Sequence, residues 1–169
     1  MSSSNDDLFR SAIEHYRSGR GHEARRICRE IVAGNERHGQ AQAMLGLLAH
    51  REHDYGEAAR RFLLASQAQP DQPLHRVNLG AALLAGERWD EAAEAMARAT
   101  IDFPHNASLW SGLGNAHAGK EDWSRAEAAF ARAAEAEPGN PDHSYNRALA
   151  CDRAGHQDEA VTHYNTVLK

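Results

Sequence analysis

The sequence predicts an all-α protein, an α-α superhelix built from five helix-turn-helix repeats. Three observations carry this prediction. The chain is rich in alanine, with 32 Ala among 169 residues, and alanine has the highest intrinsic helix propensity. Identical or similar residues recur every 34 positions along the chain. Proline ends the second, third and fourth periods, at Pro70, Pro104 and Pro138, and glycine stands where the first helix of the fourth period would end.

The 34-residue period is visible in columns of small and bulky residues. One small column is Ala12, Gly46, Gly80, Gly114 and Ala148; a second is Ala24, Ala58, Ala92, Ala126 and Ala160; a bulky column is Cys28, Phe62, Met96, Phe130 and Tyr164. Small residues on both helices of a copy let the helices cross at close range, and the bulky residue fills the space beside the crossing. Because a single copy cannot bury the apolar residues of these columns by itself, we expect the copies to stack.

Each copy is predicted to form two helices joined by a short turn. In the fourth copy we expect the first helix over about 107–119 and the second over about 124–137, with Gly119 where the first helix ends. Pro138 and Pro141 then end the second helix and open the next copy, because proline cannot continue a helix but suits its first turn.

These columns resemble the tetratricopeptide repeat (TPR) family. The fourth copy carries the residues of the family's pattern in order, namely Trp110, Leu113, Gly114, Ala126, Phe130, Ala133 and Pro138. The resemblance implies a single TPR solenoid over residues 1–169, with copies at about 5–38, 39–72, 73–106, 107–140 and 141–169. The terminal copies depart from the pattern, since Ser11 and Arg147 stand where leucine is usual. Members of the family commonly end with a polar helix that covers the last repeat, and we do not expect such a helix after the fifth copy.

Composition and charge exclude several classes of protein. A formal net charge of −5 and a pI near 6.1 argue against nucleic acid as the main partner. The N-terminus has no basic region followed by an apolar run, and no stretch approaches the roughly 18 apolar residues of a membrane span. We therefore expect a cytoplasmic protein that binds neither a membrane nor a cofactor.

Catalytic and metal-binding spacings are not found in the sequence. None of the common nucleophile, phosphate-loop or zinc motifs is present, so we expect no catalytic residue and no enzyme activity. His50 and His53 have an i, i+3 spacing that can place two imidazoles on one helix face. A metal site needs a third ligand, so we interpret these rings as solvated and expect no metal. Cys28 and Cys151 cannot make a disulfide framework or a zinc cluster on their own.

Two further columns carry both a structural and a functional interpretation. Trp89 and Trp123 share a column with Tyr55 and could stack on bases or sugars, but we favour packing of each ring against the neighbouring repeat. His15 and His117 share a column that faces the partner helix, and we expect packed, hydrogen-bonded, neutral rings.

In the TPR family, the first helix of each repeat lines a concave face that holds an extended peptide or a helix. Helical periodicity assigns the second, fifth, sixth, ninth, twelfth and thirteenth positions of each copy to this face. The residues that we predict to form a peptide-binding groove there are Arg10, Tyr16, Arg17, Met44, Leu47, Arg51, Leu74, Val77, Asn78, Asn115 and Asn146.

The charge of this face is uneven. Arg10, Arg17 and Arg51 gather toward its N-terminal end, and the first copy carries a net charge of +1 while every later copy is negative. Arginine pairs strongly with carboxylates, which predicts a partner with an acidic segment. In the alternative interpretation these arginines are solvated or paired with acids on their own helix, such as Glu14. Both interpretations stay open at this point.

Asparagines on the same face suggest contacts to a peptide backbone. Asn78 and Asn146 share the sixth position and Asn115 holds a ninth position, and an amide both donates to and accepts from a backbone. This partly resembles the asparagine ladder in the repeats of O-linked N-acetylglucosamine transferases. The carboxylate clamp of TPR proteins that grip chaperone tails is not expected, because Ser111 stands where its lysine would be.

The function predicted from these features is a non-catalytic protein-protein interaction scaffold or adaptor that binds a peptide or helix in its concave groove. An alternative from another class is the N-terminal recognition domain of a larger enzyme, of glycosyltransferase, sulfotransferase or methyltransferase type. On the final helix, an apolar stripe recurs where earlier copies receive the next repeat, which predicts a homo-oligomer or further chain. The residues assigned to this self-association are Val161, Tyr164, Val167 and Leu168.

Overall fold

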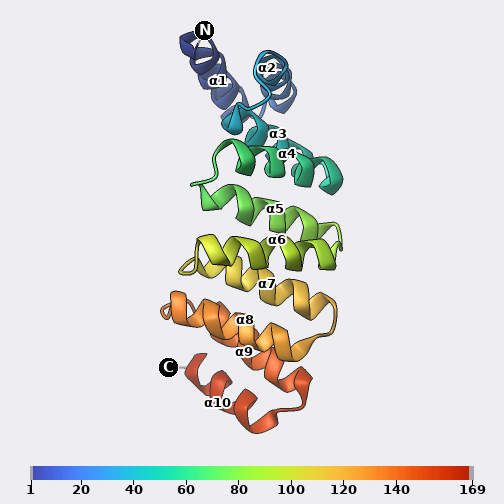
Figure 1. The fold of residues 1–169 in the computed structure, drawn as a ribbon, viewed down its shortest axis with the longest axis vertical. Coiled ribbons are helices and arrows are strands. Elements are labelled where there is room, and N and C mark those ends of the chain that lie inside the picture. The colour runs from blue at the N-terminus through green and yellow to red at the C-terminus, as the bar shows by residue number, and fades with distance from the viewer. Residues whose placement is uncertain (1, 168–169) are drawn as a thin grey trace. The chain divides into compact units, whose positions relative to one another are not determined.

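The chain is all-α in a computed structural model that describes residues 2–167, and this part contains no strand (Figure 1). The helices are α1 (Ser2–Arg17), α2 (Gly21–Gly34), α3 (Gly39–Arg51), α4 (Tyr55–Ala68), α5 (Pro73–Ala85), α6 (Trp89–Asp102), α7 (Ala107–Gly119), α8 (Trp123–Ala136), α9 (Pro141–Ala154) and α10 (Gln157–Val167). Each predicted copy contains two of them, joined by a short turn. The predicted all-α fold class is confirmed.

Two compact units make up the chain, Met1–Ala82 and Leu83–Lys169, and their boundary falls inside α5. We refer to them as unit 1 and unit 2 and describe each by itself. The single array over residues 1–169 stays a prediction.

The helices of the fourth predicted copy lie close to their expected bounds. Helix α7 has the expected limits, and α8 begins one residue earlier, at Trp123. Side chains cap both helices: the Asn106 carboxamide oxygen accepts from the Leu109 amide at 3.1 Å, and the Asp122 carboxylate accepts from the Arg125 amide at 3.2 Å. Such caps satisfy backbone donors that have no partner within the helix, which explains why the helices begin at these residues.

The small and bulky columns meet as the sequence predicts. In unit 1, a Cβ added at Gly46 would lie 2.9 Å from the Phe62 ring, and in unit 2 a Cβ at Gly114 would lie 2.6 Å from Cε1 of Phe130. Both rings are almost fully buried. Each glycine is therefore required by the close approach of a phenylalanine from the second helix of its own copy.

Helix α7 ends at Gly119, as expected, but this glycine is not the residue with left-handed backbone in the turn that follows. The left-handed backbone lies two residues later, at Glu121, where φ is 58°. The same column has a positive φ in every copy, at Gly19, His53, Glu87, Glu121 and Gly155. Glycine adopts this conformation without strain, whereas residues with a Cβ are disfavoured in it. The terminal copies therefore have relaxed turns, and the three middle copies have strained ones.

The aromatic column of unit 2 packs on the neighbouring repeat, as we expected. A Cβ at Gly119 would lie 2.6 Å from the Trp89 ring, so this glycine makes room for the indole. The guanidinium carbon of Arg153 lies 5.9 Å from the Trp123 ring centroid. Both indoles thus hold a turn against the first helix of the next copy.

The expectation that His15 and His117 are packed, hydrogen-bonded and neutral is only partly correct. His15 and His117 are half-buried, but Nδ1 of each is buried without a hydrogen-bond partner among the residues that the structure describes. Burial lowers the pKa of His117, which favours the neutral ring. The rings are packed, and the hydrogen bonds that we expected at these two Nδ1 atoms are not made within the part of the chain that the structure describes.

Candidate functional site

The candidate partner-binding surface of unit 1 is formed by α1 and α3. Tyr16 lies in the last turn of α1 and Arg51 is the last residue of α3. The guanidinium carbon of Arg51 lies 5.6 Å from the Tyr16 ring centroid, within cation-π distance. With the exposed residues Arg17 and Leu47, this pair forms what we call the Tyr16–Arg51 surface.

A buried cluster beneath this surface fixes its position. Tyr16 packs against the core of unit 1, in which Ala12 from α1 and Leu48 from α3 are buried. Met44 belongs to the same core and is only 8% exposed. The predicted groove residue Met44 therefore supports the surface from below, because its side chain is used in packing α3 onto the neighbouring helices.

The arginines of the predicted groove differ in their partners. Arg10 pairs with Asp7 on its own helix, with 3.1 Å between Nη1 and Oδ1, and both side chains are exposed. Arg17 and Arg51 have no carboxylate partner among the described residues, and Glu14 does not pair with either. The same-helix interpretation therefore holds for Arg10, with a different acid from the one expected, and does not hold for Arg17 and Arg51.

Exposed leucines add apolar area to the first helices of unit 1. Leu47 is 39% exposed and lies one turn before Arg51 on α3, so the two side chains share a helix face. Leu74, in the first turn of α5, is 61% exposed. Val77 and Asn78 on the same helix are half-buried.

The two predicted asparagines of unit 2 lie on different helices. Asn115 is exposed on α7, and Asn146 is half-buried on α9. Each is described within unit 2, and the ladder that would join them to Asn78 stays a prediction. The Ser111 hydroxyl, at the position of the clamp lysine, lies 2.8 Å from Nδ1 of His143.

The predicted self-association residues divide into exposed and packed ones. Val161 is 59% exposed on α10, whereas the Tyr164 ring lies 5.8 Å from the Tyr145 ring on α9. Val167 is half-buried, and Leu168 lies outside the described residues. Burial raises the pKa of Tyr164. The exposed part of the stripe is therefore centred on Val161.

Within residues 2–167, no third metal-ligating side chain accompanies His50 and His53. His50 and His53 lie around the Tyr55 ring, at centroid distances of 5.3 and 5.8 Å, and Nδ1 of His53 lies 2.8 Å from the Tyr55 hydroxyl. Sequence reasoning missed a different cluster, in unit 2, where Glu127, Cys151 and His163 bring their ligand atoms within 4.8 Å of one another. Glu127 and Cys151 are 24 residues apart, and Cys151 and His163 are 12 apart, which matches no short metal-binding motif. The only signal in the sequence is that each of the three differs from the residue 34 positions earlier.

The chain belongs to the tetratricopeptide repeat family. The model of this family matches residues 9–73, 77–141 and 111–169, which together span most of the chain. The resemblance noted in the sequence is thereby confirmed. No curated protein matches the chain significantly.

Several solved structures share the fold. The MamA structure from Desulfovibrio magneticus RS-1 is 20% identical, with 97% of this chain and 93% of that chain covered and a TM-score of 0.84. A crystal structure of MamA protein is 17% identical over 99% of this chain and 92% of that chain, with a TM-score of 0.89. YrrB, described as a TPR protein with an unusual peptide-binding site, is 18% identical over 95% and 83%, with a TM-score of 0.79. At these identities the similarity shows the TPR fold.

No helix within the described part of the chain combines the length and the apolar character that crossing a bilayer requires. The cytoplasmic location expected from the sequence stays a prediction.

Proposed function

We propose that this chain is a non-catalytic protein-interaction scaffold and that the Tyr16–Arg51 surface of unit 1 binds a partner segment containing acidic and apolar residues. Membership of the TPR family supports the general role. The observation that carries the specific role is the pair of exposed arginines, Arg17 and Arg51, that have no carboxylate partner among the described residues. Arg17 follows Tyr16 in the chain, and Arg51 lies one helical turn from the exposed Leu47.

The stacking of Arg51 on Tyr16 favours binding of a carboxylate. A long side chain loses rotamer entropy when a partner fixes it, and the tyrosine ring already restricts the Arg51 guanidinium near its face. The remaining donors of the planar guanidinium can pair with a carboxylate in a bidentate manner. Less conformational freedom is therefore lost when an acidic side chain arrives.

The leucine on the same face supplies the second half of the recognition. Leu47 lies one helical turn from Arg51 and exposes apolar area that a partner residue would cover. Covering apolar area contributes about 25 cal/mol per Å² to binding before the entropic cost of association is counted. We expect a partner in which an apolar residue stands one or two positions from an acid.

The alternative function is a recognition domain of a larger enzyme. No feature of the fold, of the partner-binding surface or of the similar solved structures favours it. The backbone contacts expected of Asn78 in unit 1, and of Asn115 and Asn146 in unit 2, stay predictions; all three residues are at least partly exposed.

The experiment that tests the proposal measures binding of a fluorescein-labelled peptide of alternating Glu and Leu by fluorescence anisotropy. Changing Arg17 and Arg51 together to Glu should weaken binding by about tenfold or more, because each attraction becomes a repulsion. Raising the salt concentration should weaken the wild-type interaction as well. The control is Arg26→Glu on α2, where the native arginine is also exposed but lies on the second helix of its copy and pairs with Glu30 at 3.6 Å.

Two results would refute the proposal. One is a loss of binding free energy in Arg26→Glu that is half or more of the loss in the double variant, which changes the net charge twice as much; this would show that only net charge matters. The other is equal binding of a matched peptide in which Gln replaces Glu, which would show that the arginines do not recognise carboxylates.

A further inference from the structure

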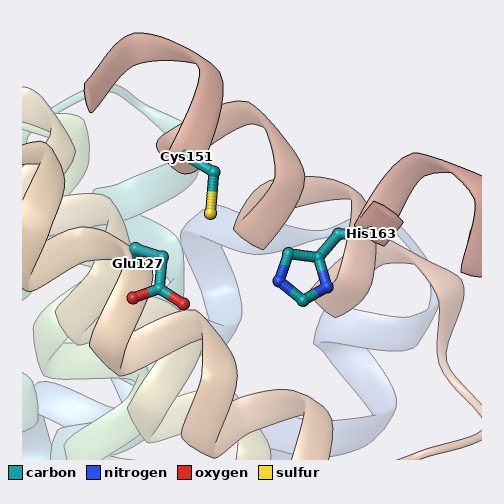
Figure 2. A group of neighbouring side chains, drawn as sticks. All are labelled: Glu127, Cys151 and His163. Atoms are coloured by element: carbon teal, nitrogen blue, oxygen red, sulfur yellow. The ribbon is translucent and has the colours of Figure 1, made fainter. Parts of the chain in front are cut away.

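Three side chains from three helices of unit 2 converge on one point (Figure 2). Glu127 comes from α8, Cys151 from α9 and His163 from α10. One ligand atom from each, a carboxylate oxygen, the Sγ and a ring nitrogen, lies within 4.8 Å of both others. Thiolate, imidazole and carboxylate are the three ligand types that proteins use for zinc.

The 34-residue period provides an independent observation at the same place. In the preceding copy the equivalent positions are Ala93, His117 and Ala129, so two alanines have been replaced by Glu127 and His163. Alanine is sufficient for packing at these columns, and burying a polar group is unfavourable unless the group gains a partner. Glu127 has such a partner in Arg147, and the two replacements bring a carboxylate and an imidazole to the same buried thiol.

We propose that Glu127, Cys151 and His163 bind one divalent transition-metal ion of the zinc type, with a fourth coordination position open to water. Metal-ligand distances of about 2.0–2.3 Å in a tetrahedral site place the ligand atoms about 3.3–3.8 Å apart. Closing the cluster from its present span requires a movement of about 1 Å at the ligand atoms. Glu127 and His163 are half-buried and can make it by side-chain rotation, whereas Cys151 is fully buried and fixed. The thiol gives its proton to water as the metal-sulfur bond forms.

One basic residue lies at the site and sets its affinity. Nε of Arg147 donates to Oε1 of Glu127 at 2.7 Å, in the column where the three inner copies carry leucine. The guanidinium leaves the second carboxylate oxygen available but repels a divalent cation. Removing this positive charge should therefore strengthen metal binding, whereas a purely structural ion pair predicts no such gain.

The test uses the full chain with Cys28→Ser, which leaves Cys151 as the single thiol. Titration with Co²⁺ should reach one equivalent and produce a thiolate-to-cobalt charge-transfer band in the near ultraviolet, and Zn²⁺ should abolish the band by displacement. Cys151→Ser should remove the band. His163→Gln and Glu127→Gln should each weaken binding at least about tenfold, by analogy with the size of ligand-shell effects. The control His105→Gln, which removes an exposed histidine between α6 and α7, should leave binding unchanged.

The last variant is Arg147→Gln, for which we expect a severalfold increase in affinity for Co²⁺ because the repulsive guanidinium is removed. Because Cys151 is buried, circular dichroism must show that Cys151→Ser is folded. If this variant is unfolded, the Co²⁺ affinities of His163→Gln and Glu127→Gln decide whether the site exists. The proposal is overturned if Co²⁺ binds without a thiolate band, or if His105→Gln weakens binding as much as His163→Gln. An unchanged affinity in Arg147→Gln would likewise overturn the placement of Glu127 in the site.

Discussion

Substituting Gly114 by Ala tests the helix crossing of the fourth copy directly. The new Cβ would lie 2.6, 2.7 and 2.8 Å from three carbons of the Phe130 ring, about 1 Å closer than the optimum for carbon atoms. The ring is only 3% exposed and is packed with Ala126 and Ala150, so it cannot move without overpacking α9. Overpacking costs about 1–3 kcal/mol, and the helix gains about 1 kcal/mol when Gly becomes Ala. We expect a net loss of about 1 kcal/mol in the free energy of unfolding.

Urea denaturation followed by far-ultraviolet circular dichroism measures this loss, with the m-value as a check on the unfolding mechanism. Gly139→Ala is the matched control, because nothing lies within 4 Å of its added Cβ and its φ is not positive. That variant should be stabilised by about 0.4–1 kcal/mol. In a Phe130→Leu background, Gly114→Ala should no longer destabilise, giving a coupling energy of about 1–3 kcal/mol. A wild-type or higher stability of Gly114→Ala alone would refute the crossing.

Three further predictions follow from local features. Glu87→Gly should raise the free energy of unfolding by about 0.5–1 kcal/mol, and Gly155→Ala should lower it by about 1–2 kcal/mol, since both positions have positive φ. A destabilised Glu87→Gly or a stabilised Gly155→Ala in urea denaturation would contradict the turn geometry. Burial raises the pKa of Cys28 from 9.0 to about 12, so the native state holds this proton more tightly. Stability should then fall as the pH rises above 9.0, by at most about 1.4 kcal/mol per pH unit from this group, and Cys28→Ala should show a shallower fall. Finally, Val161→Glu should shift a self-associating chain to monomer in sedimentation velocity; a wild-type chain that is monomeric at high concentration would exclude self-association through α10.

The sequence predicted the helices and their crossings well because these depend on local and periodic features. Gly114 and Phe130 are 16 residues apart in one copy, and the 34-residue period repeats their relation. A small residue opposite a bulky one leaves a single close-packed arrangement for two adjacent helices. The capping residues Asn106 and Asp122 act within three residues of their own position, so their effect on helix bounds is also local.

The turns and the partner surface were less predictable from sequence. Glycine at position 119 correctly indicated the end of α7, but the sequence did not show that its missing side chain makes room for Trp89 of the preceding copy. The left-handed conformation instead falls on Glu121, a residue type that rarely signals it. Met44 fits the helical pattern of the groove, yet lies in the core, because periodicity gives the direction of a side chain and not how far a neighbouring helix covers it.

By itself, the sequence determined the all-α TPR fold and the candidate first-helix faces, because helix propensity and a 34-residue packing period are properties of the chain read in order. Only the tertiary structure showed that Arg51 stacks on Tyr16 and that Glu127, Cys151 and His163 share one point. Each of these contacts joins side chains from different helices. Their distances depend on helix packing and rotamers, which no spacing along the chain specifies.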